Sequence, residues 1–181
     1  MTKTVFAALA ALAMLAISAP APAVLSQGVL APQIVTKGAI KGREFTFNLE
    51  QALKRGPVVL YFYPKAFTQG CTLEAHAFAE AADQFKAAGA TVIGMSADDL
   101  PTLKRFSTEA CRDKFAVAIA SPQVIAAYDV KLTKPDGAAT GLSSRTSYVI
   151  GKDRRVKFAH SNMDYRDHVR LTLQAVKSLR R

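Results

Sequence analysis

Residues 58–71 read Val-Val-Leu-Tyr-Phe-Tyr-Pro-Lys-Ala-Phe-Thr-Gln-Gly-Cys and join a strand, a loop and the start of a helix. The residues before Pro64 are apolar or aromatic without alternation, a pattern typical of a strand that is covered on both faces of its sheet. Pro64 ends this strand, because it cannot donate to the hydrogen-bond ladder and its φ is fixed. We therefore expect a buried strand that leads through a short loop into a helix.

Cys71 falls in the first turn of that helix. Small and apolar residues recur at helical spacing after the loop, namely Leu73, Ala77, Phe78, Ala81, Ala82 and Phe85. In a first helical turn, unpaired backbone N–H groups and the positive end of the helix dipole stabilise a thiolate. The position therefore favours a reactive cysteine, although a lone cysteine after a strand is more often a buried structural residue.

Strand and helix patterns alternate with short breaks, which predicts an α/β fold with helices on both faces of the sheet. The order of elements is that of a thioredoxin-like fold with a mixed central sheet, an argument by analogy.

Alternation of Phe45, Phe47 and Leu49 predicts a small hairpin at the sheet edge. Gly89 is expected to end the helix of Cys71, and Asp99 to cap the next one. The expected strands cover residues 58–63, 91–96, 115–119, 145–151 and 155–160, and the expected helices cover 71–88, about 100–112, 122–128 and a final helix capped near Asn162 or Asp164.

The first residues have the features of a secretory signal. Lys3 supplies a positive charge, residues 5–17 are apolar but too few to span a bilayer comfortably, and residues 21–23 offer an Ala-x-Ala cleavage site. An uncleaved membrane anchor is the alternative, but it requires a run of about twenty apolar residues. We expect residues 1–23 to be removed and residues 24–181 to form one domain, exported to a bacterial periplasm.

The charge and the histidines point to no nucleic-acid, membrane or metal partner. The formal charge is +10, and loss of the leader, which carries one Lys and no acid, leaves +9. Because the basic residues are scattered, we expect neither nucleic-acid binding nor stable membrane insertion of the mature domain. His76, His160 and His168 lack the spacing of a metal site, so no metal or other cofactor is expected. The two cysteines of an exported chain form a static disulfide, a redox pair, or a catalytic thiol with its resolving partner.

The string Tyr-Phe-Tyr-Pro-Lys-Ala-x-Thr-x-Gly-Cys-Thr-x-Glu-Ala at residues 61–75 resembles the active-site motif of the peroxiredoxins. It is most similar to the peroxiredoxin Q, or bacterioferritin-comigratory, branch, and the resemblance extends from about Val29 to the C-terminus. It implies a thioredoxin-like fold and a thiol-dependent peroxidase that reduces hydrogen peroxide and organic hydroperoxides. The partners implied are a peroxide and a thioredoxin-like or other dithiol reductant, and we expect a monomer.

The same resemblance implies a role for each residue of the motif. Cys71 is the peroxidatic nucleophile, Pro64 shields its thiolate from water, and the Thr68 hydroxyl binds the thiolate and the peroxide. Arg145, in Ser-Arg-Thr-Ser-Tyr-Val-Ile, resembles the arginine that stabilises the thiolate and the departing oxygen, and Glu74 orients it. Without the resemblance, Thr68 is a turn residue, Arg145 a surface arginine and Glu74 a first-turn acid favoured by the helix dipole.

The resolving cysteine departs from the commonest pattern of the branch. Many peroxiredoxin Q sequences carry a second cysteine five residues after the first, and His76 stands there in this chain. The resemblance leaves Cys111 as the only intramolecular partner, at the end of the helix that Asp99 caps. A Cys71–Cys111 disulfide then requires both helices to unwind locally, because a disulfide needs Cα atoms within about 7 Å.

Two other functions remain open at this point. A thioredoxin-like disulfide oxidoreductase uses a Cys-x-x-Cys pair, but Thr68 occupies the first of those positions. A non-catalytic binding domain would instead keep Cys71 and Cys111 in a static bridge. The distinguishing property is whether the thiols cycle between peroxide and dithiol.

Overall fold

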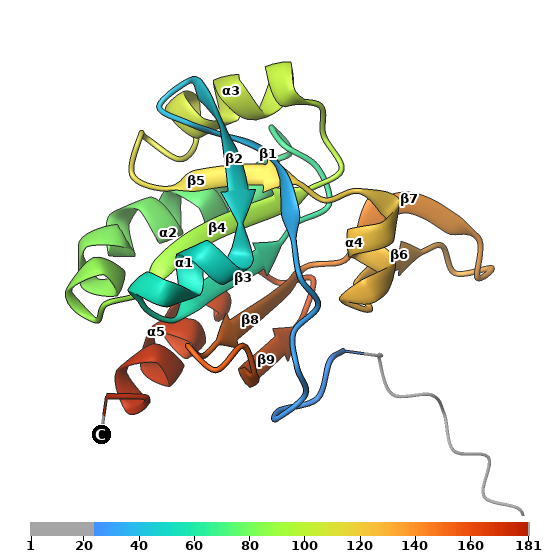
Figure 1. The fold of residues 1–181 in the computed structure, drawn as a ribbon. Helices are drawn as coiled ribbons and strands as arrows, with labels where there is room; N and C mark the ends of the chain where they lie inside the picture. Colours follow the sequence, from blue (N-terminus) through green and yellow to red (C-terminus); the bar gives the residue numbers. More distant parts are fainter. Residues whose placement is uncertain (1–23, 181) are drawn as a thin grey trace, which may run out of the picture.

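A seven-stranded mixed sheet forms the centre of the molecule, in the order β2-β1-β5-β4-β3-β8-β9 (Figure 1). The structure is a computed structural model and describes residues 24–180. The strand predicted from the sequence is β3 (Val58–Phe62), and all of its residues are buried. It pairs in parallel with β4 (Thr91–Ser96) and antiparallel with β8 (Thr146–Ile150). The predicted α/β class with a mixed sheet is confirmed.

The other strands extend the sheet at both edges or form a separate pair. β5 (Ala116–Ile119) pairs with β4, and β9 (Val156–Ser161) forms the edge beyond β8. β1 (Val35–Ile40) and β2 (Arg43–Asn48) form the hairpin that the sequence predicted. β6 (Lys131–Thr133) and β7 (Ala139–Ser143) form a two-stranded sheet that projects beside α4 in Figure 1.

Helices cover both faces of the central sheet, as expected. Alternate side chains of β3 point to opposite faces, so Tyr61 packs with α2 (Gln69–Ala87), α3 (Leu100–Glu109) and α5 (His168–Ser178). Leu60 packs on the opposite face with α1 (Leu49–Arg55) and α4 (Pro122–Ala127). Both clusters are apolar and buried, and β3 contributes to both, which explains why its sequence does not alternate.

Several boundaries differ from those expected. Leu49 was expected in a strand but begins α1, because the Asn48 side chain accepts a hydrogen bond from Gln51 N and caps a helix there. The last helix begins at His168 rather than near Asn162 or Asp164. The Asn162 side chain accepts from Asp164 N and the Asp164 side chain accepts from Arg166 N, so both residues stabilise turns before the helix.

Other helix ends agree with the sequence. Asp99 accepts from Thr102 N and caps α3, and Gly89 follows the last residues of α2 with φ of 75°. α3 ends at Glu109, however, so Cys111 lies just beyond the helix.

The predicted signal peptide, residues 1–23, lies outside the described residues. Among residues 24–180, no helix has both the length and the apolar content needed to cross a membrane.

Candidate functional site

The loop from β3 to α2 positions Cys71 at the carboxyl end of β3, where two neighbouring segments anchor the loop. The Ser143 hydroxyl donates to Tyr63 O at 2.8 Å. The Asp98 carboxylate, just past β4, accepts from Ala66 N at 2.7 Å. Cys71 therefore enters the first turn of α2 with its sulfur buried and only 2% of the residue exposed.

Asp98 is a site residue that sequence reasoning missed. A signal for it exists, since an acidic residue stands two positions after a strand parallel to β3, and the carboxyl ends of parallel strands meet at one sheet edge. Asp98 also accepts from the Ser96 hydroxyl at 2.8 Å, which holds its carboxylate toward the loop.

Arg145 contacts Cys71 although 74 positions separate them in the chain. Its Nη2 donates to Cys71 Sγ at 3.5 Å. The contact follows from the antiparallel pairing of β3 and β8, in which Thr146 lies opposite Phe62 and the start of β8 therefore meets the end of β3. Only 4% of Arg145 is exposed, so this guanidinium is not a surface group.

Glu74 binds the same guanidinium from the helix that carries Cys71. Its Oε2 accepts directly from Arg145 Nη1, and Glu74 is fully buried one turn beyond Cys71. Burial raises the pKa of the Glu74 carboxyl, whereas the adjacent Arg145 guanidinium opposes this and favours the ionised carboxylate. Burial also disfavours the Arg145 cation, but Glu74 and Cys71 outweigh it and raise the pKa of Arg145. The guanidinium therefore stays charged beside the sulfur.

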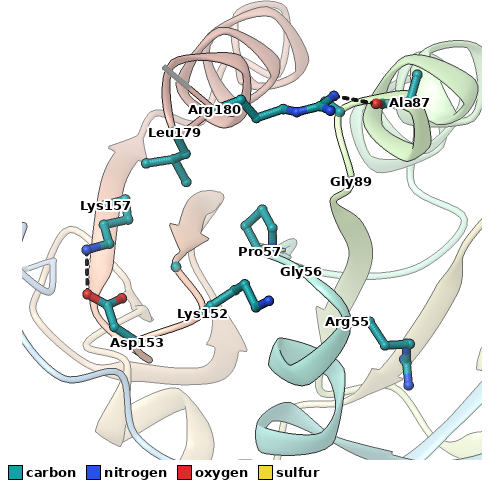
Figure 2. A pocket seen from close by; sticks show the side chains of 12 residues that line it. Arg55, Gly56, Pro57, Ala87, Gly89, Lys152, Asp153, Lys157, Leu179 and Arg180 are labelled. Carbon is teal, nitrogen blue, oxygen red and sulfur yellow. Dashed lines mark hydrogen bonds and ion pairs between the residues drawn. The ribbon is translucent and has the colours of Figure 1, made fainter.

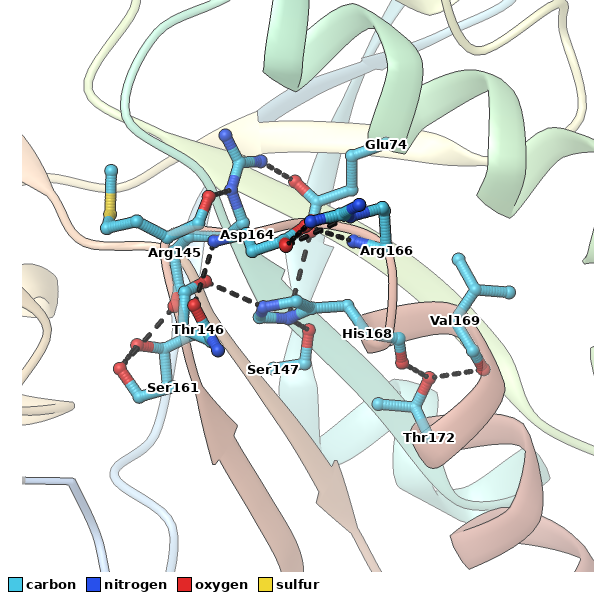
Figure 3. Close-up of polar contacts among 12 residues, drawn as sticks. Glu74, Arg145, Thr146, Ser147, Ser161, Asp164, Arg166, His168, Val169 and Thr172 are labelled. Carbon is cyan, nitrogen blue, oxygen red and sulfur yellow. Dashed lines mark hydrogen bonds and ion pairs between the residues drawn. The ribbon is translucent and has the colours of Figure 1, made fainter.

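A second set of polar residues lies behind Glu74 and Arg145 (Figure 3). His168 Nδ1 lies 3.8 Å from Glu74 Oε1 and 2.8 Å from the Ser147 hydroxyl. Arg145 Nε donates to Met163 O at 2.9 Å. Sequence analysis assigned no role to His168 or Ser147, and no spacing pattern marks either of them.

Pro64 and Thr68 flank the loop before Cys71. Pro64 is half-buried at its start, and Thr68 is the residue before α2. The Thr68 hydroxyl donates to Lys65 O at 2.9 Å, and Thr68 is exposed. Their expected roles toward a thiolate and a peroxide stay predictions.

Cys111 is not brought to Cys71. Both thiols are free and buried, and they are not at disulfide distance. They belong to one apolar cluster, in which the Tyr63 ring stacks on Phe106 of α3 at 5.3 Å between centroids. Burial raises the pKa of the Cys111 thiol and disfavours its thiolate as long as the residue remains enclosed.

A pocket of about 620 Å³ lies at the opposite end of β3, near Pro57 (Figure 2). Two of its four basic side chains have partners: Arg180 donates to Ala87 O at 2.7 Å, and Lys157 pairs with Asp153 at 2.6 Å. Arg180 thereby caps the carbonyl end of α2. Across residues 24–180, no three or more His, Cys, Asp or Glu side chains group to hold a metal ion.

The AhpC/TSA family model matches residues 28–159. The chain is a peroxiredoxin of this family. Peroxiredoxin Q from the chloroplast of Oryza sativa subsp. japonica is 32% identical over 160 residues, which cover 86% of this chain and 68% of that protein. This similarity identifies the present peroxiredoxin with the peroxiredoxin Q branch that its motif resembles.

Solved structures agree with this assignment. The crystal structure of Peroxidoxin BcpB from Mycobacterium tuberculosis is similar with a TM-score of 0.74 and 29% identity, covering 86% of this chain and 98% of that one. Peroxiredoxin Q from Xanthomonas campestris has a TM-score of 0.68 and 25% identity, covering 78% and 89%. The protein is therefore an enzyme with a thioredoxin-like fold and thiol peroxidase activity, which decides against a disulfide oxidoreductase and a non-catalytic binding domain.

Proposed function

We propose that this peroxiredoxin reduces hydrogen peroxide and organic hydroperoxides with Cys71 as the attacking nucleophile. The 3.5 Å contact from Arg145 Nη2 to Cys71 Sγ carries the proposal, because it sets a permanent cation against the sulfur. Glu74 binds the same guanidinium and keeps it oriented. The Thr68 hydroxyl donates to Lys65 O, which leaves its lone pairs to accept from the O–H of a peroxide.

In the peroxidatic step the Cys71 thiolate attacks the terminal peroxide oxygen. An S–O bond forms as the O–O bond breaks, and the remaining oxygen leaves with the electron pair and takes up a proton to become water or an alcohol. Sulfur is oxidised to a sulfenic acid and the peroxide is reduced. Negative charge moves from sulfur to the leaving oxygen, and the Arg145 fork stabilises both positions because its N–H donors lie in one plane.

Cys111 is the proposed resolving residue. Its thiolate attacks the sulfur of the Cys71 sulfenic acid, so that an S–S bond forms as the S–O bond breaks, and the departing hydroxide takes up a proton and leaves as water. A thioredoxin-like or other dithiol reductant then regenerates both thiols and is itself oxidised to a disulfide. The backbone conformation of the turn after Cys111 supports the local unwinding that disulfide formation needs. Arg112 and Asp113 have φ of 50° and 59°, a left-handed conformation that costs non-glycine residues of order 1 kcal/mol each.

Export to a bacterial periplasm completes the proposal, and it rests on the leader at residues 1–23. In that compartment the reductant is an exported dithiol protein, and the enzyme acts as a monomer. The mass of the protein recovered from the periplasm should correspond to cleavage near Ala23. Recovery of the uncleaved chain from the cytoplasm alone would contradict the proposal.

The first prediction separates the two cysteines. In a peroxide-consumption assay with excess dithiothreitol, Cys71→Ser should abolish turnover, because it removes the nucleophile. Cys111→Ser should still react, but repeated peroxide should convert its unresolved Cys71 to sulfinic acid, detectable by intact mass. Full activity of Cys71→Ser would exclude the proposed mechanism.

The second prediction concerns the guanidinium. Arg145→Ala should slow peroxide attack by roughly two orders of magnitude, as expected when a charged donor to a developing oxyanion is lost. Arg145→Lys should restore little, because one ammonium does not reproduce the planar fork. Arg170→Ala, at an exposed arginine paired with Asp167, is the matched control and should react at the wild-type rate. Equal rates for Arg145→Ala and wild type would refute the assigned role.

The third prediction is that oxidation opens the fold locally. The disulfide form should exchange amide hydrogens faster than the dithiol form in residues 71–76 and 107–113, while β3 and β4 stay protected. Hydrogen exchange with mass spectrometry measures both forms. Identical exchange in the dithiol and the intramolecular disulfide form would contradict unwinding, and a Cys111-linked dimer would mean that resolution occurs between subunits.

A further inference from the structure

The turn at Asn162 and Met163 binds Arg145 through both its side chain and its backbone. Met163 O accepts from Arg145 Nε at 2.9 Å, and Asn162 N donates to Arg145 O at 3.1 Å. The guanidinium of Arg145 thus depends on the position of a turn that follows β9 and precedes α5. Any residue that fixes this turn also fixes the donor that faces Cys71.

His168 is such a residue. Its Nε2 lies 2.9 Å from Asn162 O, and a carbonyl oxygen only accepts, so Nε2 carries the hydrogen. Its Nδ1 therefore accepts from the Ser147 hydroxyl at 2.8 Å. Both ring nitrogens are bound and the side chain is fully buried, so the ring has one orientation and one tautomer.

His168 also approaches Arg145 from the side of Glu74. Glu74 Oε2 binds Arg145, and Glu74 Oε1 is buried, finds no hydrogen-bond partner among residues 24–180, and lies 3.8 Å from His168 Nδ1 (Figure 3). The imidazole therefore packs against the free oxygen of Glu74 and closes the space into which this carboxylate could turn.

We propose that His168 is a positioning residue for Arg145, acting through the Asn162–Met163 turn on one side and through Glu74 on the other. The proposal rests on the proposed function, in which Arg145 stabilises the Cys71 thiolate and the leaving oxygen. It gives the C-terminal helix α5, which His168 opens, a part in peroxide reduction.

The positioning role requires a neutral ring. The charged and titratable groups that face His168 are Glu74 from α2, Arg145 from β8, His160 from β9 and Asp164 from the loop before α5. Burial lowers the pKa of His168 to about 4, so the imidazole is neutral when the enzyme works near neutral pH. A protonated ring would place a second cation beside Glu74 and compete with Arg145 for its carboxylate.

The test compares three substitutions by quenched-flow oxidation of Cys71 with hydrogen peroxide, read by intact mass because the chain has no tryptophan. His168→Phe keeps the volume of the ring and removes both hydrogen bonds. His168→Gln keeps an amide that can donate to Asn162 O. His160→Phe is the matched control, since its ring packs against His168 at 4.6 Å between centroids and its Nε2 has no partner among the described residues.

His168→Phe should lower the second-order rate about tenfold or more, the effect expected when a reacting group is slightly misplaced. His168→Gln should stay within about threefold of wild type, and His160→Phe should be unaffected. Ser147→Ala removes one hydrogen bond to the ring but keeps the ring itself, so its rate should lie between those of His168→Phe and wild type. This variant provides the measurement if His168→Phe does not fold. Wild-type rates for both folded His168→Phe and Ser147→Ala would overturn the proposal.

A double substitution distinguishes positioning from a structural role. If His168 acts through Arg145, His168→Phe should slow Arg145→Ala no further, because the group it positions is already gone. An equal slowing in both backgrounds would overturn the proposal. Failure of the proposed function would give a different result, because Arg145→Ala alone would then react at the wild-type rate, whatever the effect of the His168 substitutions.

Discussion

The buried guanidinium of Arg145 is the group on which the rest of the site depends. A cation taken out of water is stable in a protein only if its donors meet acceptors, and removal of one partner leaves an uncompensated charge. Arg145 satisfies this condition with a carboxylate, a backbone carbonyl and a cysteine sulfur, from Glu74, Met163 and Cys71. Two of these acceptors come from helix α2 and one from the turn after β9, so the charge connects both segments to the start of β8.

Sheet topology determines where this group is assembled. β3 and β8 run antiparallel, so the carboxyl end of β3 and the amino end of β8 lie at the same edge of the sheet. The loop to Cys71 leaves from that edge, and Asp98 and Ser143 reach the same loop from the neighbouring segments. The pocket of about 620 Å³ near Pro57 lies at the other end of β3, away from Cys71 and Arg145.

The C-terminal helix α5 contributes both to the apolar core and to the polar residues behind Cys71. Val176 of α5 packs into the same apolar cluster as Tyr61 and Phe78, and His168 at the start of that helix contacts the polar group behind Cys71. The Thr172 hydroxyl donates to His168 O at 2.6 Å and secures the first turn. Because one helix serves both purposes, a core change in α5 would also move the groups that hold Arg145.

Much of the fold could be predicted from the sequence, because the relevant signals are local. The unbroken apolar run before Pro64 predicted a strand covered on both faces. Helical spacing predicted that Cys71 lies in a first helical turn, and Asp99 predicted a capped helix. Two of the boundaries that were wrong have an equally local reason. Asn48 caps a helix where alternation suggested a strand, and Asn162 was read as a cap although its side chain stabilises a turn.

The motif identified Cys71, Glu74 and Arg145, but the sequence could not join them to Asp98, Ser143, Ser147 or His168. Those contacts depend on strand order and register, which bring together residues far apart in the chain. Cys111 agrees with what the sequence led us to expect, since the folded chain keeps both thiols free and a disulfide between them would need local unwinding. The sequence by itself determined the strand, the loop and the helical position of Cys71, because backbone propensity and periodicity act over a few residues. Only the tertiary structure decided which side chains surround that cysteine, because the packing of the sheet and of α5 sets distances that no local pattern encodes.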